Sequence, residues 1–147
     1  MTLSKPSKYA IRAVMFLASR DEEEKFSPST IAKEIDVPSP ILAKTLQVLV
    51  KNNIISSAKG RNGGFYLTKK DKKKTLLSVI KGLSEYDKLT TCFMGLPRCS
   101  DKEPCPIHYL VKALRTKMIK ELSSKSIEDF AIGIKNGETF VYLDQDK

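Results

Sequence analysis

The sequence predicts a mainly α-helical protein with a small β-hairpin wing: a winged helix-turn-helix followed by a long C-terminal helix. Two Ser-Pro pairs, Ser27-Pro28 and Ser39-Pro40, predict the starts of two consecutive helices. A glycine-rich basic turn follows them, and an amphipathic run begins at Pro106. The chain has 147 residues, of which 41% are hydrophobic and 29% charged, so it is long and apolar enough to form a hydrophobic core.

Three helices are predicted in the first part of the chain, at residues 7–19, 28–35 and 40–52. Ser7 and Ser39 are expected to cap the first and third of them. Asp36-Val37-Pro38 separates the second from the third. A short helix, a tight turn and a longer helix form a helix-turn-helix, although an ordinary helical hairpin gives the same pattern.

A β-hairpin is predicted directly after the third helix, from strands at residues 54–58 and 65–68. Between them lies Lys59-Gly60-Arg61-Asn62-Gly63-Gly64, whose glycines permit the positive φ angles of a tight turn. A helix-turn-helix followed by a basic hairpin is a winged helix, and it favours DNA binding over a purely structural role. A solvated lysine-rich connection at residues 69–74 and a short helix at 76–83 complete this half.

Positive charge is concentrated in the first half of the chain. Residues 1–74 contain 15 Lys and Arg against 7 Asp and Glu, whereas residues 75–147 contain 11 against 10. Such asymmetry indicates contact with a polyanion, although a lysine-rich surface that serves solubility has the same charge. The sequence has no signal-peptide core and no apolar span of membrane length, so we expect a cytoplasmic protein without membrane contact.

The predicted third helix presents a polar face for reading DNA. Lys44 and Gln47 are expected to reach base edges, and Lys51 a phosphate. Ser39 lies at the helix N-terminus, where backbone N–H groups favour a phosphate. On the wing, two cations are placed to enter a minor groove. The candidate DNA-binding residues are Ser39, Lys44, Gln47, Lys51, Lys59 and Arg61.

A long helix is predicted at about residues 106–124. Its apolar stripe recurs at spacings of three and four, through Ile107, Leu110, Val111, Leu114, Met118 and Leu122. This stripe suits dimerisation, and packing back on the same chain is the alternative. Ser126 and Asp129 predict a capping box for a last short helix to about residue 134.

Three cysteines and the only histidine of the chain lie within one short segment: Cys92, Cys99, Cys105 and His108. Clustered thiols in a cytoplasmic protein indicate metal binding rather than disulfides. Three thiolates with one imidazole suit zinc, and the spacing alone leans towards zinc. Iron–sulfur clusters mostly take four cysteines, but histidine ligation is known.

The sequence resembles the Rrf2 family of winged-helix transcription regulators over residues 1–134. Residues 1–13 are similar to the N-terminal helix of the family, and residues 31–52 to its helix-turn-helix. Residues 59–65 look like its glycine-rich wing, and the cysteine segment matches its three-cysteine motif. The resemblance implies a homodimer that binds a palindromic operator, as activator or repressor.

The resemblance also implies that Cys92, Cys99 and Cys105 bind an iron–sulfur cluster, with His108 as the fourth ligand. This ligand set favours a 2Fe–2S centre. Some members instead recruit an acidic residue of the N-terminal helix to support a 4Fe–4S centre; Lys8 occupies the matching position here, so a 4Fe–4S centre would need a different fourth ligand. The segment between the first two cysteines is one residue longer than in the iron–sulfur regulators of the family.

The chain differs from the family at two places that concern DNA binding, so the resemblance does not imply which operator sequence this protein binds. Ala43 stands where a glutamate helps the cluster regulators to discriminate between classes of site. In the wing, Lys59 stands where arginine is usual, and Arg61 where proline is common.

We therefore expect a sequence-specific, homodimeric transcription regulator controlled by an iron–sulfur cluster that senses cluster supply, redox state or nitric oxide. A winged-helix protein with a structural zinc and no sensing role is the alternative. An enzyme is disfavoured because the sequence has one histidine and no phosphate-binding loop. The expected parts are a DNA-binding domain (1–83), a linker and cysteine loop (84–105), dimerisation and terminal helices (106–134), and a tail (135–147).

Overall fold

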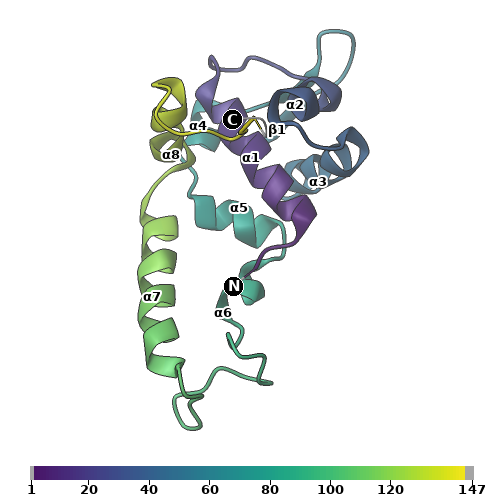
Figure 1. Ribbon diagram of the computed structural model, residues 1–147. Helices are drawn as coiled ribbons and strands as arrows, with labels where there is room; N and C mark the ends of the chain where they lie inside the picture. Colours follow the sequence, from purple (N-terminus) through teal and green to yellow (C-terminus); the bar gives the residue numbers. More distant parts are fainter. Residues whose placement is uncertain (1, 145–147) are drawn as a thin grey trace.

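The computed structural model describes residues 2–144, which contain eight α-helices and one two-stranded antiparallel sheet (Figure 1). The mainly helical winged helix-turn-helix class is therefore confirmed. In chain order the elements are α1 (Lys5–Ser19), α2 (Pro28–Ile35), α3 (Ser39–Lys51), β1 (Ser56–Ala58), β2 (Gly64–Tyr66), α4 (Lys69–Lys72), α5 (Leu76–Gly82), α6 (Tyr86–Thr90), α7 (His108–Ser124) and α8 (Ile127–Lys135).

The helix-turn-helix forms much as predicted, with one wrong cap. Ser27 caps α2 by accepting the Thr30 N–H at 3.2 Å, and α2 ends at Asp36 in the left-handed conformation (φ 52°). Ser39, however, is the first residue of α3 rather than its cap. The carbonyl of Pro38 already accepts the N–H of Leu42, so the first turn of α3 includes Ser39.

Helix α1 lies across α2 and α3 and supplies one side of the core. Its start also differs from the prediction, because Ser4 caps it and Ser7 is buried inside the first turn. The core is closed by fully buried aliphatic side chains from α1, α2 and α3, which are Val14, Ile31, Ile35, Leu42, Leu46 and Leu49.

The wing is a short hairpin anchored on the core. Strands β1 and β2 pair antiparallel, with Ser57 opposite Phe65, and Phe26 adds a bridge to Phe65. A Cβ on Gly64 would lie 2.6 Å from the Phe26 carbonyl oxygen, and its φ is +145°, so the position requires glycine. Each strand has three residues and is shorter than predicted, and β2 ends before Thr68, which caps the next helix.

The lysine-rich run at residues 69–74 is not the solvated connection that was predicted. Thr68 and Asp71 form a capping box that starts α4. Lys72 is buried and donates to the Arg20 carbonyl at 3.2 Å, and Lys74 Nζ lies 2.6 Å from Asp71 Oδ1. Lys72 and Lys74 therefore make contacts within the domain and are not fully solvated.

The C-terminal helices pack on different parts of the chain. Helix α7 runs along one side of the molecule, and α8 returns to lie against α1 (Figure 1). Residues 136–144 continue over α1, where Arg12 Nε donates to the Val141 carbonyl at 2.6 Å. In the predicted tail, the Val141 side chain packs on the core, and residues 145–147 lie outside the described part. Within residues 2–144, no helix is long and apolar enough to cross a membrane.

A buried carboxylate joins the start of α1 to the corner between α5 and α6. Ser7 Oγ donates to Glu85 Oε1 at 2.7 Å, Ser4 Oγ donates to the same oxygen, and Lys88 Nζ lies 2.8 Å from Oε2. Burial alone raises the pKa of Glu85, but the hydrogen bonds from Lys88, Ser4 and Ser7 lower it to about 2. The charged form of Glu85 therefore stabilises the contact between the N-terminus and the segment that leads into the cysteine loop.

We expect Glu85→Gln to lose about 3 kcal/mol of unfolding free energy at neutral pH, because the folded state lowers the carboxyl pKa. This contribution is present above the ordinary pKa and is lost as the pH falls from about 5 towards 2. Denaturant unfolding at several pH values measures it. The wild type should converge on the variant in acid, whereas Glu34→Gln, at an exposed position, should follow the wild type throughout. Parallel curves for wild type and Glu85→Gln would contradict the assignment.

Candidate functional site

The outer face of α3 is polar, exposed and basic. Lys44, Gln47 and Lys51 are exposed on the side opposite the buried leucines, as predicted from the spacing. Ile41 and Val48 are also exposed, at 43% and 41%. Ile41, Lys44, Val48 and Lys51 are separated by three, four and three residues, so they lie on one face of the helix. Apolar side chains on a helix usually belong to the core, so the sequence alone did not mark these two as surface residues. Apolar side chains there suit contact with thymine methyl groups.

The remaining candidate DNA contacts lie at the ends of their elements. Ser39 is half-buried at the first turn of α3, and Lys59 and Arg61 are exposed on the loop between β1 and β2. This loop turns at Gly60, with φ +96°, and is closed by the Gly63 N–H donating to the Gly60 carbonyl at 3.1 Å. The two wing cations therefore stand on a tight, solvent-facing turn.

The cysteine segment forms an irregular loop between α6 and α7. Cys92 lies just after α6, and His108 is the first residue of α7; both are buried. Cys99 and Cys105 are half-buried. The loop therefore keeps all four predicted ligand side chains away from full exposure, while other side chains such as Phe93 remain at the surface.

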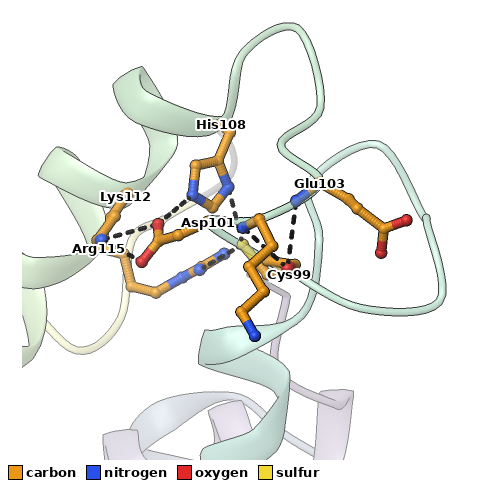
Figure 2. Close-up of polar contacts among 8 residues, drawn as sticks. Cys99, Asp101, Glu103, His108, Lys112 and Arg115 are labelled. Carbon is orange, nitrogen blue, oxygen red and sulfur yellow. Dashed lines mark hydrogen bonds and ion pairs between the residues drawn. The ribbon is translucent and has the colours of Figure 1, made fainter.

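Two of the four predicted ligands are in direct contact. Cys99 Sγ lies 3.4 Å from His108 Nδ1 (Figure 2). Leu96, Met94, Cys105 and Gly95 act together to lower the pKa of Cys92 through hydrogen bonding. The hydrogen bond from Leu96 is the main cause that lowers the pKa of Cys92, against the opposing effect of burial. This end of the loop thus favours a thiolate, the form that binds metals.

Three charged residues around the Cys99–His108 pair were missed by the sequence analysis (Figure 2). Asp101 Oδ1 lies 2.7 Å from His108 Nε2, and Lys112 Nζ lies 2.8 Å from both Asp101 oxygens. Hydrogen bonds from Lys112 and His108 lower the pKa of Asp101. Arg115 is buried and donates to Cys99 Sγ at 3.2 Å. Lys112 and Arg115 follow His108 by one and two turns of α7, a spacing that could have identified them.

Arg115 also joins the loop to the end of α6. Its Nη2 donates to the Thr91 carbonyl at 2.6 Å, and its buried Nε has no hydrogen-bond partner within residues 2–144. The guanidinium therefore bridges Thr91, at one end of the cysteine loop, and Cys99, in its middle. Both hydrogen bonds are donated by the charged guanidinium, and hydrogen bonds from a charged donor are stronger than those between neutral groups. Arg115, which belongs to α7, therefore fixes the loop against this helix.

The donor set differs from a closed site for a single metal ion. In the described part of the chain, no three His, Cys, Asp or Glu side chains gather as they would around one ion. Three thiols and an imidazole, none of them fully exposed, supply the number and the types of donor that an iron–sulfur cluster would take.

A helix-turn-helix followed by a hairpin wing, with exposed cations on both, defines a winged-helix DNA-binding protein. Comparison with known proteins identifies the family within this class. Residues 3–132 match the model of the Rrf2 family, described as iron-dependent transcriptional regulators. The chain belongs to the Rrf2 family: it is a DNA-binding transcription regulator and not an enzyme.

Relatives cover nearly the whole chain. A putative HTH-type transcriptional regulator of Aquifex aeolicus is 31% identical, over 88% of this chain and 90% of the relative. The regulator NsrR of Oceanobacillus iheyensis is 26% identical over 97% and 96%, and the regulator IscR of Photorhabdus laumondii 27% over 88% and 78%.

Solved structures share the fold. CymR of B. subtilis, the global cysteine regulator of that organism, superimposes with a TM-score of 0.70 at 20% identity, covering 90% of this chain and 97% of CymR. T. potens IscR gives a TM-score of 0.68 at 17% identity, covering 95% and 93%. At these identities the likeness concerns the fold alone.

Proposed function

We propose that this protein is a cytoplasmic, homodimeric transcription regulator whose DNA affinity is set by an iron–sulfur cluster bound by Cys92, Cys99, Cys105 and His108. The observation that carries the proposal is that one loop of a winged-helix regulator holds three thiols and one imidazole, none of them fully exposed, with Cys99 Sγ 3.4 Å from His108 Nδ1. The names of the relatives NsrR and IscR support it. By the family resemblance, three cysteines with one histidine favour 2Fe–2S over 4Fe–4S, and a structural zinc is the alternative.

When held by Cys92, Cys99, Cys105 and His108, a cluster would tie these parts of the loop together and supply a centre that responds to oxidants or nitric oxide. The residues around it connect the loop to the DNA-binding half. Arg115 joins Cys99 to α7, and α7 packs on α5 through Met118, Ile119 and Leu122 against Leu77 and Ile80.

Helix α5 in turn contacts the end of α3, the helix proposed to read DNA. Asn52, which ends α3, donates its side-chain N–H to the Gly82 carbonyl at 2.7 Å. A Cβ on Gly82 would lie 2.7 Å from Ile54, so the two elements are in close contact. A change in the loop therefore has a continuous set of packed contacts through which to reposition α3.

An uncovered apolar surface on α7 supports the dimer. One side of α7 packs on α5, but Tyr109, Leu110 and Leu114 are 65%, 65% and 55% exposed. Phe93 and Met94 of the neighbouring loop add exposures of 64% and 54%. Adjacent exposed apolar side chains mark an interaction site. Twofold pairing there would give the two recognition helices that a palindromic operator requires.

The double variant Lys59→Ala, Arg61→Ala, which removes both wing cations, should bind any DNA duplex more weakly. The slope of log affinity against log salt should become shallower by about 2, because each of the two cations is proposed to neutralise one phosphate. Fluorescence anisotropy with labelled DNA over a salt series measures both quantities. Lys102→Ala with Lys135→Ala removes equal charge at exposed positions away from the wing and should leave the slope unchanged. An unchanged slope in the wing variant would remove these residues from the interface.

Anaerobic purification followed by an absorption spectrum and assays for iron, sulfide and zinc tests the cofactor. The proposal predicts a coloured protein with about two irons and two acid-labile sulfides per chain. Four irons per chain would indicate a 4Fe–4S centre. A colourless protein with one tightly held zinc would contradict the sensor and leave a structural metal site.

A further inference from the structure

His108 is buried at the start of α7, and side chains of the preceding loop contact both of its ring nitrogens. Nδ1 faces Cys99 Sγ at 3.4 Å, and Nε2 faces Asp101 Oδ1 at 2.7 Å. The side chain of His108 is 3% exposed, so water has little access to either nitrogen. The loop therefore decides which nitrogen carries a proton and which offers a lone pair.

The Asp101 side chain is held as an acceptor. Lys112 Nζ bridges its two oxygens at 2.8 Å each, and the two residues lie side by side with His108 in Figure 2. A carboxylate paired in this way has no proton to give, so the hydrogen between Oδ1 and Nε2 belongs to the ring. In a neutral imidazole the other nitrogen, Nδ1, then carries the lone pair, and that lone pair is directed to the side of Cys99.

We propose that Asp101, held by Lys112, is a positioning residue that fixes His108 in its Nε2-protonated form and so assigns Nδ1 as the metal-binding atom beside Cys99. Histidines that bind metals commonly donate their second N–H to a carboxylate, which sets the tautomer and the ring orientation. The assignment of the metal-binding atom rests on the proposed function, whereas the tautomer assignment does not depend on any metal.

The tautomer is measurable without a cluster because His108 is the only histidine of the chain. In the full-length apo protein labelled with ¹⁵N-histidine, a long-range ¹H–¹⁵N spectrum contains a single imidazole. At a pH where the ring is neutral, we expect a protonated Nε2 and an unprotonated Nδ1. Protonation at Nδ1, or an even mixture of both forms, would overturn the proposal.

Three variants separate positioning from folding. Asp101→Ala should convert the single tautomer into a mixture, whereas Asp101→Asn keeps a carbonyl acceptor and should retain the wild-type pattern. Glu103→Ala, in the same loop, removes a carboxylate that pairs with Arg98 and does not contact His108, so it should change nothing. An Asp101→Ala spectrum identical to that of the wild type would overturn the proposal.

The metal-binding atom is tested on protein reconstituted with iron and sulfide and then reduced. Histidine labelled with ¹⁵N at Nδ1 alone should alter the nitrogen hyperfine coupling of the paramagnetic cluster, and Nε2 labelling should leave the strong coupling unchanged. We also expect Asp101→Ala to bind iron about 10-fold to 100-fold more weakly. Strong coupling from Nε2 would overturn the assignment. If no cluster assembles, the proposed function fails, and the apo spectrum still decides the role of Asp101.

Discussion

Replacing Leu110 and Leu114 by glutamate is expected to convert a dimer into a monomer and to weaken binding to a palindromic operator by about 100-fold or more, the gain that two linked sites provide. Both side chains lie on the uncovered face of α7, 65% and 55% exposed. In the proposed dimer this face is buried, and a carboxylate without a partner is unfavourable there. In a monomer the same glutamates remain in water, so the fold should survive.

Analytical ultracentrifugation and DNA titration measure the two parts of this expectation. The variant should sediment as a folded monomer and bind a full palindrome no better than a half-site. Ile132→Glu with Leu143→Glu places the same charges on exposed apolar positions elsewhere, at 50% and 73% exposure, and should stay dimeric. A Leu110/Leu114 variant that remains a dimer would exclude this face as the interface.

Replacing Cys99 by alanine is expected to reduce the iron and sulfide content to less than about a tenth of the wild-type content, because a soft thiolate ligand is lost from a four-donor set. Cys99 is the sulfur that contacts both His108 and Arg115, so its removal also takes away the centre of that contact network. The DNA affinity of the variant should equal that of wild-type protein without its cluster.

Met94→Ala is the matched control for this variant. It removes a sulfur-containing side chain from the same loop, but Met94 is 54% exposed and is not among the proposed ligands. Iron content and spectrum should match the wild type. A Cys99→Ala protein that retains full iron and sulfide would contradict the ligand assignment.

The parts of the fold that local chemistry determines could be predicted from the sequence. Ser27 and Pro28 mark the start of α2, and Ser126 with Asp129 forms the predicted capping box of α8. Parts that depend on tertiary contacts could not. Helix α4 needs Asp71, which also accepts from Ser56 Oγ at 2.7 Å, and the C-terminal segment needs Arg12 as its donor.

The candidate site divides in the same way. Clustering in one short segment, together with the family resemblance, marked the three cysteines and His108 as candidates, and helical spacing predicted the outer face of α3. Asp101 could not be assigned, because its contact with His108 depends on how an irregular loop folds back on α7. The stripe on α7 was predicted as one surface, but packing splits it: Val111 is buried, whereas Leu110 and Leu114 remain exposed.

The central claim, that the cluster sets DNA affinity, is tested most directly by titrating one anaerobic preparation against DNA before and after chelation removes the iron. Salt must be held fixed, because phosphate contacts make the affinity strongly salt-dependent. A target is first selected from random duplexes with the cluster-loaded and the iron-free protein in parallel. We expect the affinity for the selected DNA site to differ by about 10-fold or more between the cluster-loaded and the iron-free protein. Equal affinity in both forms would contradict it.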